Sequence, residues 1–487
     1  MPKDNNWSIS IIAPFQGFSP SYWEETYPSY GNKSMAGAMT DVNIISPDRL
    51  TQGSGLVALT NGTQAGSVTT LIDHILNIPS ANDVTWGIGG NLLYKISSTA
   101  VANSGGYPHT IDKATVTGED GESVVYYNGY VYYFYNHSGS AGDFGRLTVS
   151  TDTFDDDFGS TVPTGAAALT NNPHPAIIGG DGIIYFGNGA AVGYYDPATG
   201  VNGTVSTLQL DLSNDVIVVD LIWDKDALWI ATNSPNISTG NTNRGIIYLW
   251  DTVSTSYQEP IIEVNGKLGA MFVKNGRIFV SYQDLSSTGG FKLGYIVGDT
   301  IQELAGFTGT LPQFGQITYF KNMIAFLSNA QVYLWGATSN KLPTALSQYM
   351  DGGYSTSGAL ANPFGTLMVA SMQSTSFELM KESGYSILSL WKTLMFDVAT
   401  SIVDKVKVHY YATASGASVA LTLRYNRGAS TFSLGTINHT NDSAQLKKSF
   451  YPKQECEDFR IEFDWSGGSA TNALAIKKID ISGHFVS

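Results

Sequence analysis

Four aspartates lie close together in the stretch Asp152-Thr153-Phe154-Asp155-Asp156-Asp157. Carboxylate oxygens are the hard ligands that Ca²⁺ and Mg²⁺ prefer, so Asp152, Asp155, Asp156 and Asp157 form a candidate cation site. The stretch lacks the Gly and the terminal Glu of an EF-hand loop. A solvated loop between two strands is therefore the competing interpretation, and the pattern favours it.

Other residue types that carry chemistry do not form a recognisable set. The single Cys456 cannot complete a zinc site, and the seven histidines show no paired ligand spacing. Gly-x-Ser-x-Gly elbows and phosphate-binding Gly-rich loops are absent from the sequence. Glycoside hydrolysis needs two carboxyl groups about 5–9.5 Å apart, a distance that a sequence does not reveal. The repeated Ser-x-Asp-x-Gly-x-x-Trp boxes of sialidases are missing. We therefore expect no enzyme and no cofactor.

The composition indicates an all-β protein. The chain has 487 residues, of which 43% are hydrophobic and only 14% charged, with 52 Gly, 27 Tyr and 22 Phe. Aromatic residues pack well on pleated sheets, and Gly supplies the positive φ that tight turns need. One cysteine allows no intrachain disulfide. The first residues lack an apolar signal region and no run of about 18 apolar residues follows. We expect synthesis in the cytoplasm and no membrane insertion.

Charge is distributed unevenly along the chain. The net charge is −15, and residues 385–487 hold 11 Lys+Arg against 9 Asp+Glu, so residues 1–384 carry a net −17. Tight binding of nucleic acid needs clustered cations that neutralise phosphates. The acidic body therefore argues against tight DNA binding, although it is compatible with DNA that slides past without specific binding.

A repeated pattern organises residues 84–370. A turn followed by an apolar triplet recurs at intervals of 39 to 53 residues, with the turns at Gly89-Gly90, Asn128-Gly129, Asp181-Gly182, Lys225-Asp226, Asn275-Gly276, Lys321-Asn322 and Phe364-Gly365. Asn-Gly and Asp-Gly between apolar runs are strong hairpin signals. Repeats of about 45 residues with three or four strands are typical of propeller blades. The pattern predicts a β-propeller of about seven blades. Ordinary hairpins in a large sandwich or β-helix are the alternative.

The periodicity also divides the chain into three parts. Residues 1–83 do not repeat and predict an N-terminal arm with first strands, including an extended segment over 14–23. Residues 84–384 form the propeller. Residues 385–487 alternate between apolar and polar side chains, which predicts a C-terminal β-sandwich. On one strand, Val406, Val408 and Tyr410 face the core while Lys405, Lys407 and His409 face solvent.

This layout resembles a known group of virion proteins. An N-terminal arm leads to Asp41–Leu50 (DVNIISPDRL) and Gly53–Leu59 (GSGLVAL), and the sandwich ends in Ala475–Ile481 (AIKKIDI). This order is similar to that of the tail nozzle, or packaged-DNA stabilisation, proteins of short-tailed bacteriophages. The resemblance implies a structural component of the virion tail, without a reaction or a cofactor. It also implies a hexameric ring that contacts adjacent tail or neck proteins, retains the packed genome and later lets the DNA pass through a channel.

Other functions fit the same architecture. A tail-fibre, head-fibre or baseplate protein would use the propeller to bind host glycan. A propeller glycoside hydrolase would cleave glycan. A cellular scaffold of the WD40 type is the remaining alternative, because Trp250-Asp251 matches the Trp-Asp dipeptide of such repeats, although the accompanying Gly-His is missing. The Tyr126–Tyr135 cluster could stack on bases or sugars, but aromatic side chains that fill the space between blades are the favoured interpretation.

Overall fold

The structure is a computed structural model of the 487-residue chain. It describes residues 6–12, 36–40, 42–43, 51–52, 55–59, 68–77, 83–114, 116–138, 141–165, 168–199, 202–212, 215–234, 244–284, 290–320, 323–329, 331–336, 344–348, 354–373, 376–383, 388–393, 395–411, 416–438, 442, 446–466 and 474–486. These residues are almost all in strands, and the one helix among them is the single turn α1 (Phe158–Thr161). In the described residues no helix is long and apolar enough to span a membrane.

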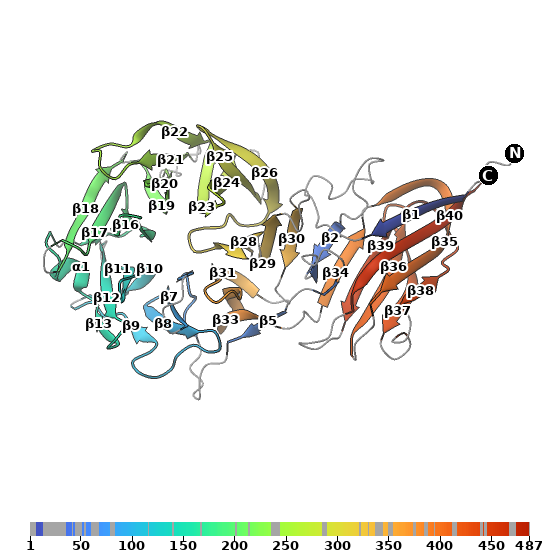
Figure 1. The fold of residues 1–487 in the computed structure, drawn as a ribbon, viewed down its shortest axis with the longest axis horizontal. Helices are drawn as coiled ribbons and strands as arrows, with labels where there is room; N and C mark the ends of the chain where they lie inside the picture. The colour runs from blue at the N-terminus through green and yellow to red at the C-terminus, as the bar shows by residue number, and fades with distance from the viewer. Residues whose placement is uncertain are drawn as a thin grey trace.

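The predicted propeller is confirmed and has seven blades, each an antiparallel sheet (Figure 1). The first blade consists of β6 (His74–Ile75), β7 (Val84–Gly89), β8 (Leu92–Ser97) and β9 (His109–Thr110). The second consists of β10 (Asp120–Tyr127), β11 (Tyr130–His137), β12 (Ala141–Thr148), β13 (Thr153–Asp155) and β14 (Leu169–Thr170). The third consists of β15 (Ala176–Ile178), β16 (Ile184–Asn188), β17 (Ala191–Asp196) and β18 (Thr204–Asp211). The fourth blade consists of β19 (Ile217–Asp224), β20 (Ala227–Asn233), β21 (Gly245–Trp250) and β22 (Gln258–Val264). The fifth consists of β23 (Gly266–Lys274), β24 (Arg277–Asp284), β25 (Gly290–Val297) and β26 (Thr300–Thr308). The sixth consists of β27 (Ile317–Phe320), β28 (Met323–Ser328), β29 (Gln331–Gly336) and β30 (Thr344–Gln348).

The N-terminal part of the chain closes the ring. The seventh blade contains β31 (Tyr354–Ala361), β32 (Met368–Gln373) and β33 (Ser376–Ser383), and its fourth strand is β5 (Gly55–Ala58). The chain then continues into β6, so β5 and β6 belong to the propeller although they precede residue 84. The first strand of each blade contacts the first strand of the next, and β31 returns to β6. Every blade therefore has a neighbour on both faces.

Buried side chains fill the spaces between blades. One cluster joins Trp86 and Ile88 of the first blade to Val131, Tyr133 and Tyr135 of the second, and all five are fully buried. Comparable clusters join the second blade to the third, the third to the fourth, and the fourth to the fifth. Burial between blades is thus the role of the aromatic cluster that the sequence places at residues 126–135.

The predicted hairpins join the first two strands of the second, third, fourth, fifth and seventh blades, whereas the hairpin at Gly89-Gly90 joins β7 to β8, the second and third strands of the first blade. Asn128 and Gly129 have φ of 49° and 86°, and Asn275 and Gly276 have φ of 52° and 69°, as a type I′ turn requires. The turn at Lys321-Asn322 lies outside the described residues. Turn chemistry in the sequence therefore located the blades correctly wherever the structure describes the turn.

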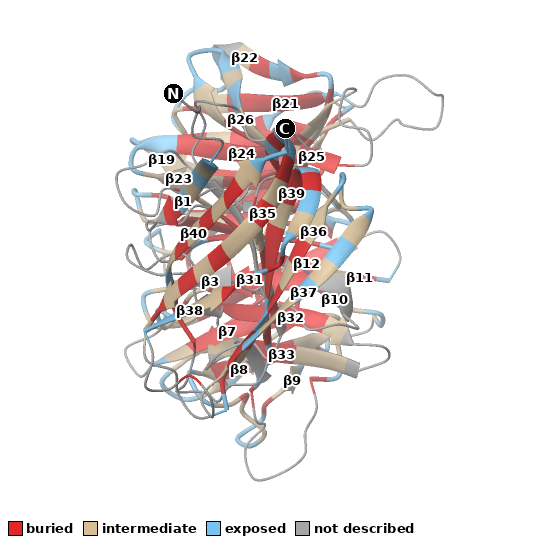
Figure 2. Ribbon diagram, turned by 90° about the vertical axis from the view of Figure 1, so that its right-hand side faces the viewer, coloured by how far each residue is buried: buried red, intermediate tan, exposed pale blue. Residues whose placement is uncertain are grey.

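The C-terminal domain is a two-layer β-sandwich built around the long strand β35 (Phe396–Tyr410). The first part of β35 pairs with β39 (Gln454–Ser466), and the last part pairs with β40 (Ile476–Phe485) and β38 (Lys447–Phe450). The β39 layer is completed by β34 (Leu388–Thr393), β36 (Ser418–Tyr425) and β37 (Ser430–Asn438). Buried and less buried residues alternate along β35 and β40 (Figure 2). Val406, Val408 and Tyr410 are buried as predicted.

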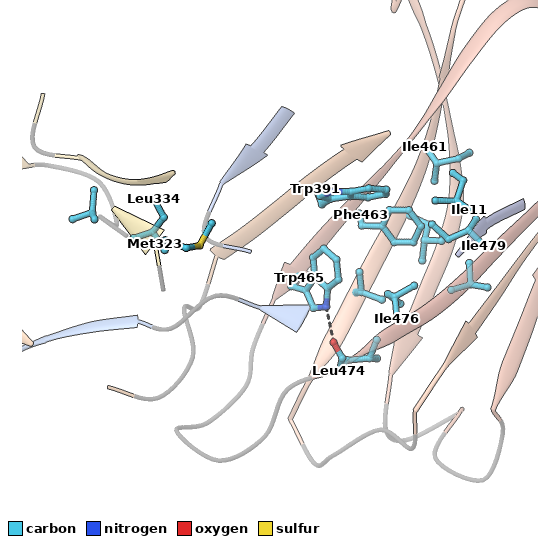
Figure 3. Packing of buried hydrophobic residues seen from close by; sticks show 14 of the residues in the cluster. Ile11, Met323, Leu334, Trp391, Ile461, Phe463, Trp465, Leu474, Ile476 and Ile479 are labelled. Atoms are coloured by element: carbon cyan, nitrogen blue, oxygen red, sulfur yellow. Dashed lines mark hydrogen bonds between the residues drawn. The ribbon is translucent and has the colours of Figure 1, made fainter. Parts of the chain in front are cut away.

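The core of the sandwich continues toward the sixth blade. Trp391, Phe463 and Trp465 pack between the layers, and the Trp465 indole N–H donates to the Leu474 carbonyl at 2.9 Å (Figure 3). Met323 of the sixth blade belongs to the same cluster of buried side chains. Glu462 departs from the predicted alternation.

Polar residues alternate with apolar residues along β39, so the sequence predicts that Glu462 faces solvent, yet only 7% of its surface is exposed. Arg424, Arg460 and Lys392 pair with its carboxylate, which explains how the charge is accommodated.

The N-terminal segment also joins the sandwich. Strand β1 (Asn6–Ile12) pairs with β40, and β2 (Ala36–Thr40) pairs with β34. A short separate pair is formed by β3 (Val42–Asn43) and β4 (Thr51–Gln52). The extended segment predicted over 14–23 lies outside the described residues. The first 60 residues thus contribute strands to both the sandwich and the propeller.

One buried carboxyl group ties the fourth blade to the fifth. Asp220 on β19 is 3% exposed and accepts hydrogen bonds from the backbone N–H of Leu221 at 2.7 Å and of Met271 on β23 at 2.5 Å. Burial raises the pKa of Asp220 to about 7, and the two hydrogen bonds act in the opposite direction.

We expect Asp220→Ala to destabilise the propeller by about 1–3 kcal/mol, because two buried N–H groups lose their acceptor. The pKa of this carboxyl is higher in the folded than in the unfolded state. Its contribution to stability is therefore present at acidic pH and is lost as pH rises through about 7. Urea unfolding of both proteins should show a larger difference near pH ~5.5 than near pH ~8.5. The exposed turn variant Asp226→Asn should show no such dependence; an Asp220→Ala effect independent of pH would contradict the interpretation.

Candidate functional site

The aspartate run of the sequence lies at the outer edge of the second blade, on β13 and the start of α1. Asp156 accepts from the backbone N–H of Asp112 at 3.1 Å and from the Tyr133 hydroxyl, and it pairs with His109 Nε2 at 2.9 Å. Asp157 pairs with Lys113 at 3.2 Å. These contacts connect the loop after β9 to the second blade.

The remaining aspartates are engaged elsewhere. Asp152 accepts from Lys95 at 3.1 Å and from the Tyr107 hydroxyl at 2.9 Å. Asp155 pairs in register with Arg146 of β12. Across the part of the chain that the structure describes, no group of three or more His, Cys, Asp or Glu side chains is arranged to hold a metal ion. The structure brings the four aspartates into contacts between strands, and the candidate cation site at these residues stays a prediction.

The most buried ion pair of this region joins Lys113 to Asp143. The Asp143 side chain is fully buried, and Lys113 also donates to Ser160 Oγ at 2.8 Å. Burial lowers the pKa of Lys113, but the hydrogen bonds and charges of Asp143 and Asp157 outweigh it and raise that pKa overall. Lys113 therefore stays charged and holds the loop after β9 against the second blade.

A second group of carboxyl groups lies on the inner strands of the first two blades. Asp73 immediately precedes β6, while Asp120 and Glu122 lie on β10. We call these three residues the inner-strand carboxylates. Their strands are held together, because the Val124 N–H donates to His74 Nδ1 at 3.0 Å and the Gly121 N–H donates to the Gly90 carbonyl at 2.6 Å.

The surroundings of these groups favour their neutral forms. Burial raises the pKa of Glu122 to about 7, the negative charges of Asp120 and Asp73 add to this, and a hydrogen bond from Asn136 Nδ2 at 2.7 Å opposes it. Burial and the charge of Asp120 raise the pKa of Asp73 to about 7. Burial also raises the pKa of Asp120. Asp73 and Asp120 remain in contact with solvent, whereas Glu122 is half-buried.

This arrangement can supply the two functions that glycosidic bond cleavage needs. A carboxyl group with a pKa near neutrality can donate a proton, and a neighbouring carboxylate can act as base or nucleophile. Sequence analysis missed the three residues, because the Asp152–Asp157 run is contiguous and they are not. The sequence carried no signal for the group, because Asp73 precedes the predicted repeats, and only the structure places it before β6, the first strand of the blade next to β10.

The comparisons with known proteins concern the fold. No family model matches the chain, and no curated protein matches it. Among solved structures, an exo-β-1,3-galactanase from Phanerochaete chrysosporium aligns with 66% of this chain and 98% of its own, at 10% identity and a TM-score of 0.32. An arabinoxylan arabinofuranohydrolase of glycoside hydrolase family 43 from Bacillus subtilis aligns with 87% of this chain and 98% of its own, at 12% identity and a TM-score of 0.26.

Other similar structures are not hydrolases. A chain of a mitotic checkpoint complex aligns with 68% of this chain and 99% of its own, at 11% identity and a TM-score of 0.40. Drosophila semaphorin 1b aligns with 66% of this chain and 87% of its own, at 8% identity and a TM-score of 0.37. At this level of identity the similarities speak to the fold alone.

The matches change one expectation and leave another untested. Because glycoside hydrolases are among the structures that align with this fold, the prediction that the chain is not an enzyme is withdrawn. The resemblance to tail nozzle proteins is tested by none of these matches and stays a prediction.

We expect Lys113→Met to destabilise the protein by about 3–5 kcal/mol, because the fully buried Asp143 carboxylate loses its cation. Lys95→Met is the matched control, since the Lys95–Asp152 pair is partly exposed and such pairs contribute only about 0–1 kcal/mol. Thermal unfolding of both variants checks the difference. Equal effects of the two substitutions would show that Lys113 has no special role.

Proposed function

We propose that this protein is a glycoside hydrolase that uses the inner-strand carboxylates. The observation that carries the proposal is the half-buried Glu122, whose pKa is raised to about 7 beside two further carboxyl groups. A carboxylic acid that keeps its proton near neutral pH is the proton donor that cleavage of a glycosidic bond requires.

Each carboxylate has a distinct task in the proposed reaction. Glu122 gives its proton to the glycosidic oxygen as the bond from that oxygen to the anomeric carbon breaks. Asp120 takes a proton from the water whose oxygen bonds to the anomeric carbon, and the proton on Asp120 later returns to Glu122 through solvent. The charge of Asp73 helps to keep the pKa of Glu122 high, and Asn136 orients the Glu122 carboxyl group.

We expect Glu122→Gln to reduce the release of reducing sugar from a polysaccharide substrate at least about 100-fold, because the amide cannot donate the proton. Wild-type activity should fall as pH rises above about 7, where Glu122 loses its proton. The assay uses a panel of plant, fungal and bacterial polysaccharides. Asp226→Asn, a change at an exposed turn, should retain full activity. No release from any polysaccharide, or full activity of Glu122→Gln, would refute the proposal.

A second proposal rests on the resemblance to tail nozzle proteins. In it the protein is a structural component of a bacteriophage tail that assembles as a homo-oligomeric ring beside other tail or neck proteins. The specific observation that favours it is the N-terminal segment, whose strands β1, β2 and β5 join both the sandwich and the propeller. An acidic body of net −17 also suits DNA that passes without binding, since few cations are present to contact phosphates.

Electron microscopy of the purified protein separates the two proposals. The tail proposal predicts closed rings, formed by the protein alone or with its neighbouring tail proteins. Substitution of Glu122 should leave the formation of these rings unchanged. Monomers under both conditions would contradict it. The hydrolase proposal makes no demand on assembly, so sugar release by a monomer would support that proposal alone.

A further inference from the structure

A cleft opens between the outer parts of the fourth and fifth blades. It has a volume of about 400 Å³ and is lined by Trp229, Ile247, Leu249, Gln258, Ile262, Gly298 and Asp299. The first five residues come from β20, β21 and β22 of the fourth blade, and the last two form the turn between β25 and β26 of the fifth. Sites for small molecules in proteins have volumes of roughly 300–1,000 Å³, so the cleft is large enough for a ligand.

Trp229 forms an aromatic wall of this cleft. Its side chain is half-buried and packs against the cluster of apolar residues between the two blades. Within the described part of the chain, its indole N–H has no hydrogen-bond partner, and its nitrogen is accessible to solvent. By contrast, the Trp250 indole N–H on β21 donates to the Ser254 carbonyl at 2.8 Å. Trp229 therefore offers both an aromatic surface and a free donor to a ligand.

The strands around Trp229 are shaped by an irregularity. The pairing of β21 with β22 shifts register between Ile247 and Leu249, and both residues line the cleft. A β-bulge bends the strand and redirects side chains, and bulges are frequent beside functional sites. The departure from regular pairing thus coincides with the opening.

Polar groups stand at the rim. Gln258 and Asp299 are exposed, and neither side chain has a hydrogen-bond partner among the described residues. The amide of Gln258 can donate and accept, the carboxylate of Asp299 accepts, and the Trp229 N–H donates. The cleft therefore combines one aromatic wall, apolar side walls and a small set of donors and acceptors.

We propose that this cleft binds a neutral sugar residue of a glycan, at a site separate from the inner-strand carboxylates. A pyranose ring has an apolar C–H face that packs on an indole and a rim of hydroxyl groups that pair with an amide, a carboxylate and an N–H. An acidic sugar would meet the Asp299 carboxylate and the net negative charge of the protein. A quaternary ammonium ion is bound by cages of several aromatic rings, and Trp229 is the single aromatic residue that lines the cleft in the described residues.

The assignment of a sugar to this cleft rests on the proposed function only for the class of ligand. Binding there would give the protein a second contact with the same glycan. A sugar held at this cleft would keep a long polysaccharide on the protein while another part of it reaches the inner-strand carboxylates. Binding at the cleft does not require hydrolysis. The two proposals can therefore fail separately.

Saturation-transfer NMR on the full-length protein tests the cleft. The probes are methyl β-D-glucoside, methyl β-D-galactoside and methyl α-D-mannoside, with glucuronic acid and choline as comparators. The Glu122→Gln background blocks the proposed hydrolysis and should leave saturation transfer to the neutral glycosides intact. Adding Trp229→Ala should weaken binding at least about tenfold, equivalent to about 1.4 kcal/mol.

Because Trp229 also packs between blades, two exposed changes serve as independent tests. Asp299→Asn and Gln258→Ala should each weaken binding about threefold or more without changing the melting temperature, whereas Asp226→Asn should change neither. The inference is overturned if no neutral glycoside binds, if choline or glucuronic acid binds in preference, or if the three cleft variants bind as the parent does. Binding that persists in a protein without measurable hydrolysis would leave the cleft standing and count against the hydrolase alone.

Discussion

Mutual burial of the blades is the constraint on which the structure depends. A four-stranded blade leaves one face wet when it is isolated, and its burial cannot offset the conformational entropy of about 45 residues. In the closed ring, side chains such as Trp86 and Tyr133 are fully buried only because two blades meet. The last blade obtains its fourth strand from β5, so the ring is held closed by a segment that precedes every other propeller strand. The blades are therefore stable together or not at all.

The same constraint explains where chemistry can be placed. Because the inner strands of consecutive blades touch, residues that lie some 50 positions apart in the sequence become neighbours, as His74 and Val124 do through a hydrogen bond of 3.0 Å. Asp73, Asp120 and Glu122 follow this rule and influence one another's ionisation. The cleft beside Trp229 arises at the outer end of another blade junction. Both candidate sites are thus products of the packing between blades and not of any single repeat.

Local signals in the sequence were sufficient to predict the strands and hairpins, because turn chemistry and the alternation of apolar and polar residues act over a few residues. Asn128-Gly129 and Asn275-Gly276 marked true hairpins, and the alternation at Val406, Val408 and Tyr410 gave the buried face of β35. Features that depend on distant partners were not accessible in this way. The pairing of β5 with β33 depends on the closure of the ring. The burial of Glu462 depends on three cationic side chains that pair with its carboxylate, two of them on other strands. The aspartate run attracted attention because its members are adjacent in sequence, whereas the structure directs them to different partners.

Two carboxyl groups with pKa values raised to about 7 show how a structural role differs from a chemical one. Asp220 is buried with each oxygen accepting a backbone N–H, and one of those donors belongs to the next blade. Its carboxyl group has no free position for a ligand, so its effect is on stability. Glu122 also has a pKa raised to about 7, but it receives one side-chain hydrogen bond, lies beside two further carboxyl groups and keeps part of its surface exposed. Raised pKa values alone do not separate the two residues. What separates them is access to the proton that each retains: Asp220 is almost fully buried, whereas Glu122 is half-buried, and the proposed role of Glu122 as a proton donor depends on that difference.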